Sequence, residues 1–178
     1  MKRFFKAVTV ILTVLALILS VGCDDTVEYT MGECKTFGME YLVPLHFALS
    51  EHEEADDYYI TVNSTVAAYA YTYDEFEDIF EYDGEFESIA IAEHVTTLRN
   101  YACNVYEGTV AGSAGFSFMF TNEDGQSFYY TASVHVSEER VYMLAFTCLA
   151  EKLDRYQDMI IEIMNSVTID ESDDSAEE

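Results

Sequence analysis

The sequence predicts an α+β fold, in which an antiparallel sheet is packed by a C-terminal amphipathic helix and a shorter middle helix. Between residues 116 and 136, apolar and polar residues alternate, which is typical of antiparallel strands with one buried face. After residue 148 the apolar residues recur every three and four positions, which is typical of a helix lying on such a sheet. A chain of 178 residues, 50% of them hydrophobic, suffices for one folded domain.

The strands are predicted from alternation, from β-branched and aromatic residues, and from the turn residues between them. In chain order they are 37–43, 58–62, 65–72, 95–98, 101–110, 116–121, 128–136 and 141–148. Pro44 ends the first strand because proline has no backbone N–H to donate. A hairpin is expected around Asn63-Ser64, and a further turn is expected before Gly125. The last strand is apolar on both faces, so we expect it at the centre of the sheet.

Two helices are predicted from apolar residues three and four positions apart. The middle helix covers residues 73–81 and begins at Asp74. The following segment, 83–93, fits either a helix or a strand. The apolar stripe of the C-terminal helix consists of Leu149, Leu153, Tyr156, Ile160, Ile163 and Val167. A stripe of this length corresponds to about five turns at 3.6 residues each.

Residues 1–22 are predicted to be a lipoprotein signal peptide. Basic residues precede an uncharged apolar run from Ala7 to Val21, which is shorter than the roughly 20 residues that a membrane-spanning helix needs. Small residues then precede Cys23, in a pattern that resembles the lipobox of bacterial lipoproteins. The resemblance implies that Cys23 is acylated and holds the chain on the extracytoplasmic side of the cell membrane. The alternatives are an ordinary cleaved signal peptide and an uncleaved anchor.

The mature chain is expected to have three parts. Residues 23–36 form an acidic membrane-proximal spacer, 37–168 form the folded domain, and 169–178 form an acidic disordered tail. The whole chain has 34 acidic and 8 basic residues and a net charge of -26. This charge excludes nucleic acid as a partner, because a nucleic-acid binder must neutralise phosphates with lysine and arginine. It also excludes docking on anionic lipids through a basic face.

Three short motifs lie along the predicted domain: Gly-x-x-Tyr-x-Val-Pro at 38–44, Val-Tyr-x-Leu-x-Phe at 141–146, and Met-Asn-Ser-Val at 164–167. Together with the order of the elements, these motifs resemble the PsbP-like and DcrB-like domains of many bacterial lipoproteins. The resemblance covers residues 37–168. It implies a sheet with helices packed against it and a binding or assembly role, and it supplies no catalytic motif.

Three cysteines remain if Cys23 is acylated: Cys34, Cys103 and Cys148. Their spacing contains no CxxC and no pattern of metal ligands, so neither a metal site nor a cofactor is expected from them. An extracytoplasmic compartment permits a disulfide. If any pair is bridged, we expect Cys103 and Cys148, which both lie in predicted strands. Both could instead be buried free thiols.

Two candidate sites involve ionisable or nucleophilic side chains. Ser133 and His135 are two residues apart on the wet face of one predicted strand, where a nucleophile and a base would still need a third, orienting group. An acidic loop lies at residues 51–57 and offers oxygen ligands to cations, but it lacks the spacing of an EF-hand. A solvated charge run is the simpler interpretation of that loop.

Tyrosines form the third candidate, because exposed tyrosines make good contact surfaces for a peptide, glycan or protein. The possible binding surface consists of Tyr58, Tyr59, Tyr69, Tyr71 and Tyr73. The alternative is that these rings cover the sheet beneath the middle helix.

The chain lacks recognisable catalytic and cofactor-binding motifs. The sequence therefore favours a lipid-anchored extracytoplasmic binding or assembly module of the bacterial cell envelope. Its expected partners are the membrane, through Cys23, and an envelope protein or small ligand. The alternatives are an envelope hydrolase with a site around Ser133 and His135, and an acidic cation-responsive domain.

Overall fold

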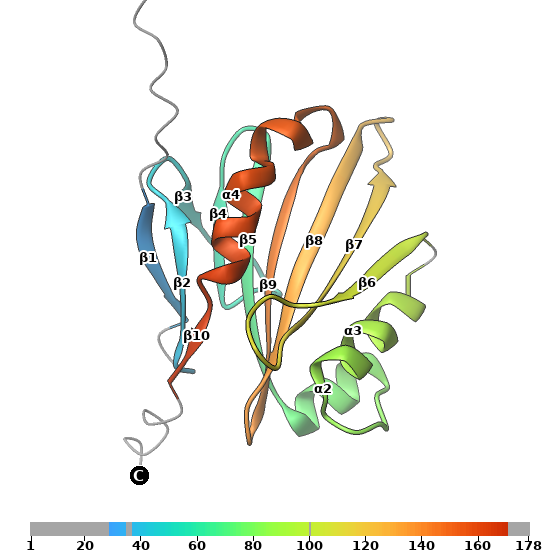
Figure 1. Cartoon of the computed structure of the whole chain (residues 1–178). Helices are drawn as coiled ribbons and strands as arrows, with labels where there is room; N and C mark the ends of the chain where they lie inside the picture. Colours follow the sequence, from blue (N-terminus) through green and yellow to red (C-terminus); the bar gives the residue numbers. More distant parts are fainter. Residues whose placement is uncertain (1–28, 35–36, 100, 171–178) are drawn as a thin grey trace, which may run out of the picture.

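The large sheet of the protein is antiparallel. The computed structural model describes residues 29–34, 37–99 and 101–170 of the chain. The large sheet has seven strands in this part of the chain. Its strands are β3 (Ala48–Ser50), β4 (Asp57–Ile60), β5 (Ser64–Thr72), β6 (Cys103–Glu107), β7 (Ala114–Thr121), β8 (Ser127–Val136) and β9 (Arg140–Leu149). They are arranged in the order β3-β4-β5-β9-β8-β7-β6 (Figure 1). The central position predicted for the last strand is confirmed, because β9 pairs with β5 on one side and with β8 on the other.

Two of the predicted turns are confirmed. The strands β4 and β5 form an antiparallel pair around Asn63, and β7 and β8 form another around the turn that ends at Gly125. Gly125 has φ +79°, a left-handed conformation that glycine adopts without steric cost. Its N–H donates to the carbonyl of Asn122 at 3.0 Å, which closes the turn.

A smaller sheet contains β1 (Tyr29–Cys34), β2 (Met39–Pro44) and β10 (Thr168–Ile169), with β2 in the middle. This sheet corrects two predicted boundaries, since β1 lies in the expected spacer and β10 extends into the expected tail. Both segments pair with β2 because its two edges are open to them. The signal peptide, Cys23 and residues 171–178 lie outside the described residues.

The middle of the chain forms two helices, α2 (Tyr73–Phe80) and α3 (Ser88–Thr97). The helix α2 begins at Tyr73, the first residue of the predicted range, and Thr72 rather than Asp74 caps it, in a reciprocal pair of hydrogen bonds with Glu75. In the segment 83–93, which fitted either a helix or a strand, residues 88–93 belong to the helix α3. This helix also shows that the predicted strand at 95–98 is wrong, since Val95 belongs to the helix and is buried with Ile91 against the sheet.

The C-terminal helix is shorter than predicted. A 3₁₀ turn, η1 (Ala150–Lys152), precedes α4 (Leu153–Asn165), while Leu149 still belongs to β9. Ser166 ends the helix: its hydroxyl donates to the carbonyl of Ile163 at 2.7 Å and accepts from the N–H of Leu42 at 2.8 Å. The chain then leaves the helix and joins β2. Val167 is buried, as the stripe predicted, but it lies beyond the helix end.

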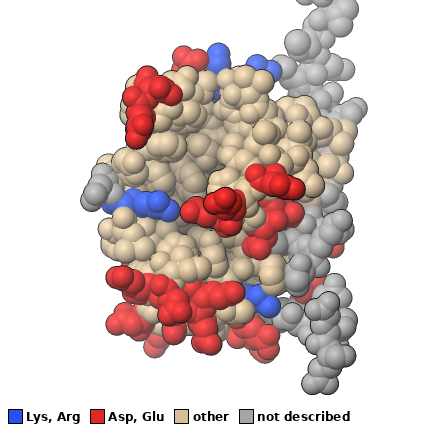
Figure 2. All heavy atoms as spheres, turned by 180° about the vertical axis from the view of Figure 1, so that it is seen from behind, with Lys and Arg blue, Asp and Glu red and all other residues tan. Residues whose placement is uncertain are grey.

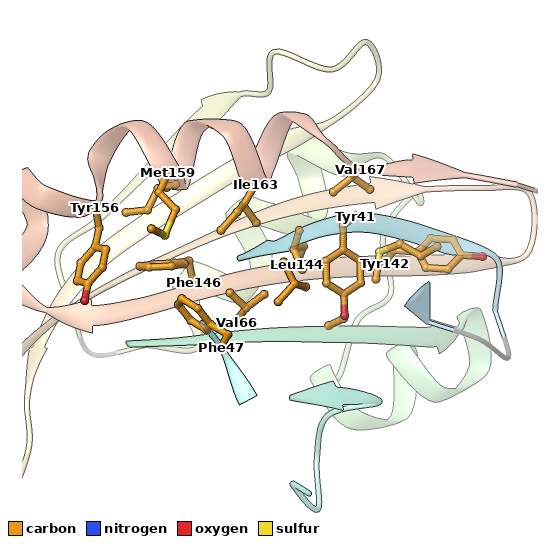
Figure 3. Close-up of a cluster of buried hydrophobic side chains, with 14 of the residues drawn as sticks. Tyr41, Phe47, Val66, Tyr142, Leu144, Phe146, Tyr156, Met159, Ile163 and Val167 are labelled. Atoms are coloured by element: carbon orange, nitrogen blue, oxygen red, sulfur yellow. The ribbon is translucent and has the colours of Figure 1, made fainter. Parts of the chain in front are cut away.

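The large sheet carries a hydrophobic core on each face. On one face, α4 and β2 pack over β5 and β9, and Figure 3 shows Ile163 pointing from α4 toward these strands. On the other face, α2 and α3 pack over Phe116 and its neighbours. None of the described helices is both long enough and apolar enough to span a bilayer. The predicted α+β class is confirmed, because the C-terminal helix α4 packs on one face of an antiparallel sheet.

Acidic side chains gather on the side of α2 and α3, as Figure 2 shows for the lower part of that face. Exposed members of this group are Glu77, Asp78, Glu81, Asp83, Glu85 and Glu87. A field of this sign repels polyanions and attracts cations.

Candidate functional site

A pocket of about 150 Å³ lies where the C-terminal half of α4 passes over the edge of the large sheet formed by β6, β7 and β8. The helix supplies apolar wall residues, among them Ile160, Ile161 and Met164. The sheet supplies Gly115 and Ser133, which face each other in paired strands. The pocket thus joins segments about 50 residues apart in the chain.

Gly115 leaves room at the sheet side of the pocket. A Cβ atom at this position would lie 2.3 Å from Cε2 of Tyr106, so the ring packs directly on the glycine backbone. The Tyr106 hydroxyl is 2.8 Å from Oγ1 of Thr131, and that threonine donates to the carbonyl of Phe116 at 3.2 Å. The ring is therefore held in place as one wall of the pocket.

The loop between β6 and β7 forms the rim. The N–H of Gly108 donates to the carbonyl of Ser113 at 2.9 Å, and the Ser113 hydroxyl donates to the carbonyl of Val110 at 2.6 Å. The Thr109 hydroxyl donates to Oδ1 of Asn165 at the end of α4. A hydrogen bond between two exposed side chains thus ties the loop to the helix across the edge of the pocket.

Ser133 is the polar group of the pocket interior. Its side chain is 7% exposed, and its Oγ has no hydrogen-bond partner among the described residues. An unpaired buried hydroxyl is unusual, because leaving such a group unsatisfied costs about 1–3 kcal/mol. The hydroxyl can donate one hydrogen bond and accept others. The pocket therefore offers a single buried hydrogen-bonding position between apolar walls.

His135 lies on the same face of β8 as Ser133, as predicted, but this face is buried rather than wet. Burial lowers the pKa of His135 to about 4, so the imidazole is neutral at pH 7. Its Nε2 and the Ser133 hydroxyl are both without a partner among the described atoms, so the two side chains do not hydrogen-bond to each other. A nucleophile activated by a base needs that bond and a group to orient the base, and neither is formed here.

The five predicted tyrosines do not form one surface. Tyr59 packs on the core beneath α4, whereas the other four pack on the opposite face of the sheet. Tyr71 lies edge-on to Phe76 and Phe80 of α2, and the Tyr73 hydroxyl donates to the carbonyl of Ser137 at 2.5 Å. The alternative prediction, that these rings cover the sheet beneath the middle helix, applies to Tyr71, whereas Tyr73 is the first residue of that helix.

Tyr58 and Tyr69 remain half-buried beside the acidic loop. Burial is the main cause that raises the pKa of Tyr69. Two carboxylates of this loop have structural partners: Asp56 accepts from the N–H of Ala70 at 2.7 Å, and Asp57 accepts from the Tyr41 hydroxyl at 3.2 Å. Within the described ranges, no group of three or more His, Cys, Asp or Glu side chains is placed to hold a metal ion.

The predicted disulfide between Cys103 and Cys148 is wrong for this fold. Both thiols are free. Cys103 is in line with Thr147 across β7 and β8, which places it three strand spacings, roughly 14 Å, from β9. Side chains alternate along a strand, so Cys148 points to the opposite face of the sheet. Burial raises the pKa of Cys148 to about 11, which makes it an unreactive thiol.

Tyr106, Gly115 and Thr131, which shape the pocket, were not predicted from the sequence. Gly115 lies one residue before the predicted strand at 116–121, so the pattern did not place it within a strand, where a glycine indicates close approach of another group. The approaching group was not readable, because Tyr106 meets Gly115 only when β6 pairs with β7.

An antiparallel sheet with α4 on one face and α2 and α3 on the other is a PsbP-like α+β fold. The cyanobacterial PsbP protein (CyanoP) of Synechocystis sp. PCC 6803 has a TM-score of 0.51 at 9% identity, with 85% of this chain and 98% of that chain covered. LpqN of Mycobacterium tuberculosis, involved in cell envelope biogenesis, has a TM-score of 0.53 at 13% identity, with 82% and 92% covered. The Ran-binding protein Mog1p of Saccharomyces cerevisiae has a TM-score of 0.54 at 9% identity, with 81% and 96% covered. No protein-family model matches the chain, and no curated protein matches it significantly in sequence.

Proposed function

We propose that this protein is a lipid-anchored, extracytoplasmic module of the bacterial cell envelope that binds a small ligand in the pocket beneath α4. The observation that carries the proposal is the Ser133 hydroxyl, which is buried in an apolar pocket without a partner among the described residues. A ligand that pairs with this hydroxyl removes the free-energy cost of leaving it unsatisfied. Binding is thus favoured at this position.

Binding is a better account of the pocket than hydrolysis. The predicted base, His135, is neutral but has no hydrogen bond to Ser133 and no partner at Nε2 among the described atoms. Ser133 in this state is an ordinary hydroxyl, which is a weak nucleophile. The same hydroxyl needs no activation to hold a ligand.

The proposed location rests on the N-terminal sequence. Basic residues, an apolar run and Cys23 follow one another as in bacterial lipoproteins. LpqN, which has the same fold, is involved in cell envelope biogenesis, and this agrees with a place in the envelope. The strongly acidic surface agrees with it as well, because it keeps the tethered domain away from anionic lipid headgroups.

The anchor is tested by Cys23→Ala. This variant is expected to lose palmitate incorporation and to move from the membrane fraction to the soluble fraction. The reason is that the acyl chains on Cys23 are proposed to anchor the protein in the bilayer. The matched control is Cys34→Ala, which should keep both properties. Palmitate labelling that is absent from the unmodified chain, or that does not depend on Cys23, contradicts the anchor.

Binding in the pocket is tested with toluene, an apolar probe. Methyl NMR of the lipidated chain in nanodiscs is expected to show a saturable shift of the Met164 signal, because Met164 lines the pocket. Met119, which is 54% exposed on β7 and does not line the pocket, provides the reference signal. If Met164 does not shift as toluene approaches its solubility limit, the pocket is not a binding site.

A further inference from the structure

We infer that the pocket selects a neutral, ring-sized ligand with one hydroxyl group, such as a phenol, whose hydroxyl pairs with Ser133. This inference rests on the proposed function, because it assumes that the pocket is the binding site. It adds the chemical class of the ligand, which follows from the size, polarity and charge of the pocket.

The size of the pocket sets the size of the ligand. Its volume of about 150 Å³ equals that of a cavity that is known to hold benzene. The ring of Tyr106 packs on the backbone of Gly115 and its hydroxyl hydrogen-bonds to Thr131, so this ring bounds the space on the sheet side. A single six-membered ring with a small substituent therefore fills the pocket.

The polarity of the pocket sets the number of polar groups on the ligand. Ile160, Ile161 and Met164 form an apolar wall, while the buried Ser133 hydroxyl can both donate and accept. A ligand hydroxyl is its complement, because a hydroxyl also donates and accepts. A second polar group that points toward this wall would lose its hydration without a new partner, because the other polar side chains of the pocket, Thr109, Ser113 and Asn165, lie at the rim.

The charge of the pocket requires a neutral ligand. The single charged residue among its lining residues is Glu107, which is exposed at the rim. A bound carboxylate or phosphate would find no cation and would be buried in the field of an acidic protein. A phenol is uncharged at pH 7, so it escapes both penalties.

The route into the pocket is consistent with a small ligand. The hydrogen bond between Thr109 and Asn165 joins two exposed side chains at the rim. Opening it exchanges one exposed hydrogen bond for bonds to water, which costs little. Larger movements of α4 would expose Ile163 and the core beneath it.

The test compares phenol, toluene and benzoate on three chains: the unmodified chain, Ser133→Ala and Ser117→Ala. Ser117 is the matched control, because it is also a buried serine on the sheet but does not line the pocket. The lipidated proteins are studied in zwitterionic nanodiscs, and the Met164 methyl signal reports occupancy. Probe uptake by the lipid is the same for all three chains, so it cancels in their comparison.

We expect Ser133→Ala to weaken phenol binding by about 2- to 10-fold, the typical worth of one neutral hydrogen bond, and to leave toluene binding unweakened. Ser117→Ala should bind phenol like the unmodified chain, and benzoate should not shift Met164 in any of them. If Ser133→Ala leaves phenol binding intact, or if benzoate binds as well as phenol, the inference is wrong while the pocket remains a binding site. If none of the three probes shifts Met164, the proposed function fails with it.

Discussion

Replacing Ile163 with aspartate is expected to cause a large loss of stability. Ile163 is 0% exposed and packs from α4 onto the core of the large sheet (Figure 3). The variant loses the burial of a large apolar side chain and places a carboxylate where it has no cationic partner. We expect the free energy of unfolding to fall by about 4 kcal/mol or more, and Tm to fall by on the order of 10 °C.

The matched control is Ile161→Asp, which makes the same chemical change on the same helix. Ile161 is 52% exposed, so its carboxylate stays hydrated and the loss of stability should stay below about 1 kcal/mol. Thermal unfolding followed by circular dichroism measures both variants. Equal losses of Tm for the two substitutions would refute the assignment of the buried face of α4.

The second large effect is a loss of stability at low pH caused by His135. This side chain is 6% exposed, and burial lowers its pKa from 6.5 to about 4 in the folded chain. Between these two values the unfolded chain binds a proton that the folded chain does not, so the free energy of unfolding rises with pH. The contribution is fully present above pH 6.5 and is lost as the pH falls toward 4. It amounts to about 3 kcal/mol for a shift of this size.

The contribution of His135 is isolated by His135→Leu. The carboxylates of the chain titrate at similar pH, so the measured quantity is the difference in unfolding free energy between the two chains at each pH. We expect this difference to change by about 3 kcal/mol between pH 7 and pH 4, in favour of the leucine variant at low pH. A difference that is independent of pH would mean that burial does not shift the pKa of His135 in the folded protein.

Side-chain pattern predicted most of the large sheet. Alternation in β7 and β8 and continuous apolarity in β9 are local properties. Alternation identified the buried face that carries Phe116, Ala132 and Val134, but the opposite face, which it predicted to be wet, is largely buried as well. The stripe on α4 likewise identified Tyr156, Ile160 and Ile163 as core residues. These predictions held because periodicity is a direct consequence of backbone geometry.

Local pattern was less informative where neighbours decide the outcome. The segment at 95–98 has the residues of a strand, yet it continues α3 because Ile91 and Val95 reach the sheet from one helix face. The segment at 29–34 has no strong strand pattern, yet it pairs with β2 because that edge is open. In both cases contacts with distant residues outweighed intrinsic preference.

The candidate site depended on tertiary structure most of all. Spacing placed Ser133 and His135 on one face of a strand, and this is a local fact. Whether that face is wet or buried depends on α4 and on Tyr106, which approach it from elsewhere in the chain. The disulfide prediction failed for the same reason. The sequence shows how side chains alternate within each strand, but it does not show that two strands, β7 and β8, lie between Cys103 and Cys148. Burial, pocket shape and disulfide geometry are properties of pairs of distant segments, so a single strand's sequence does not contain them.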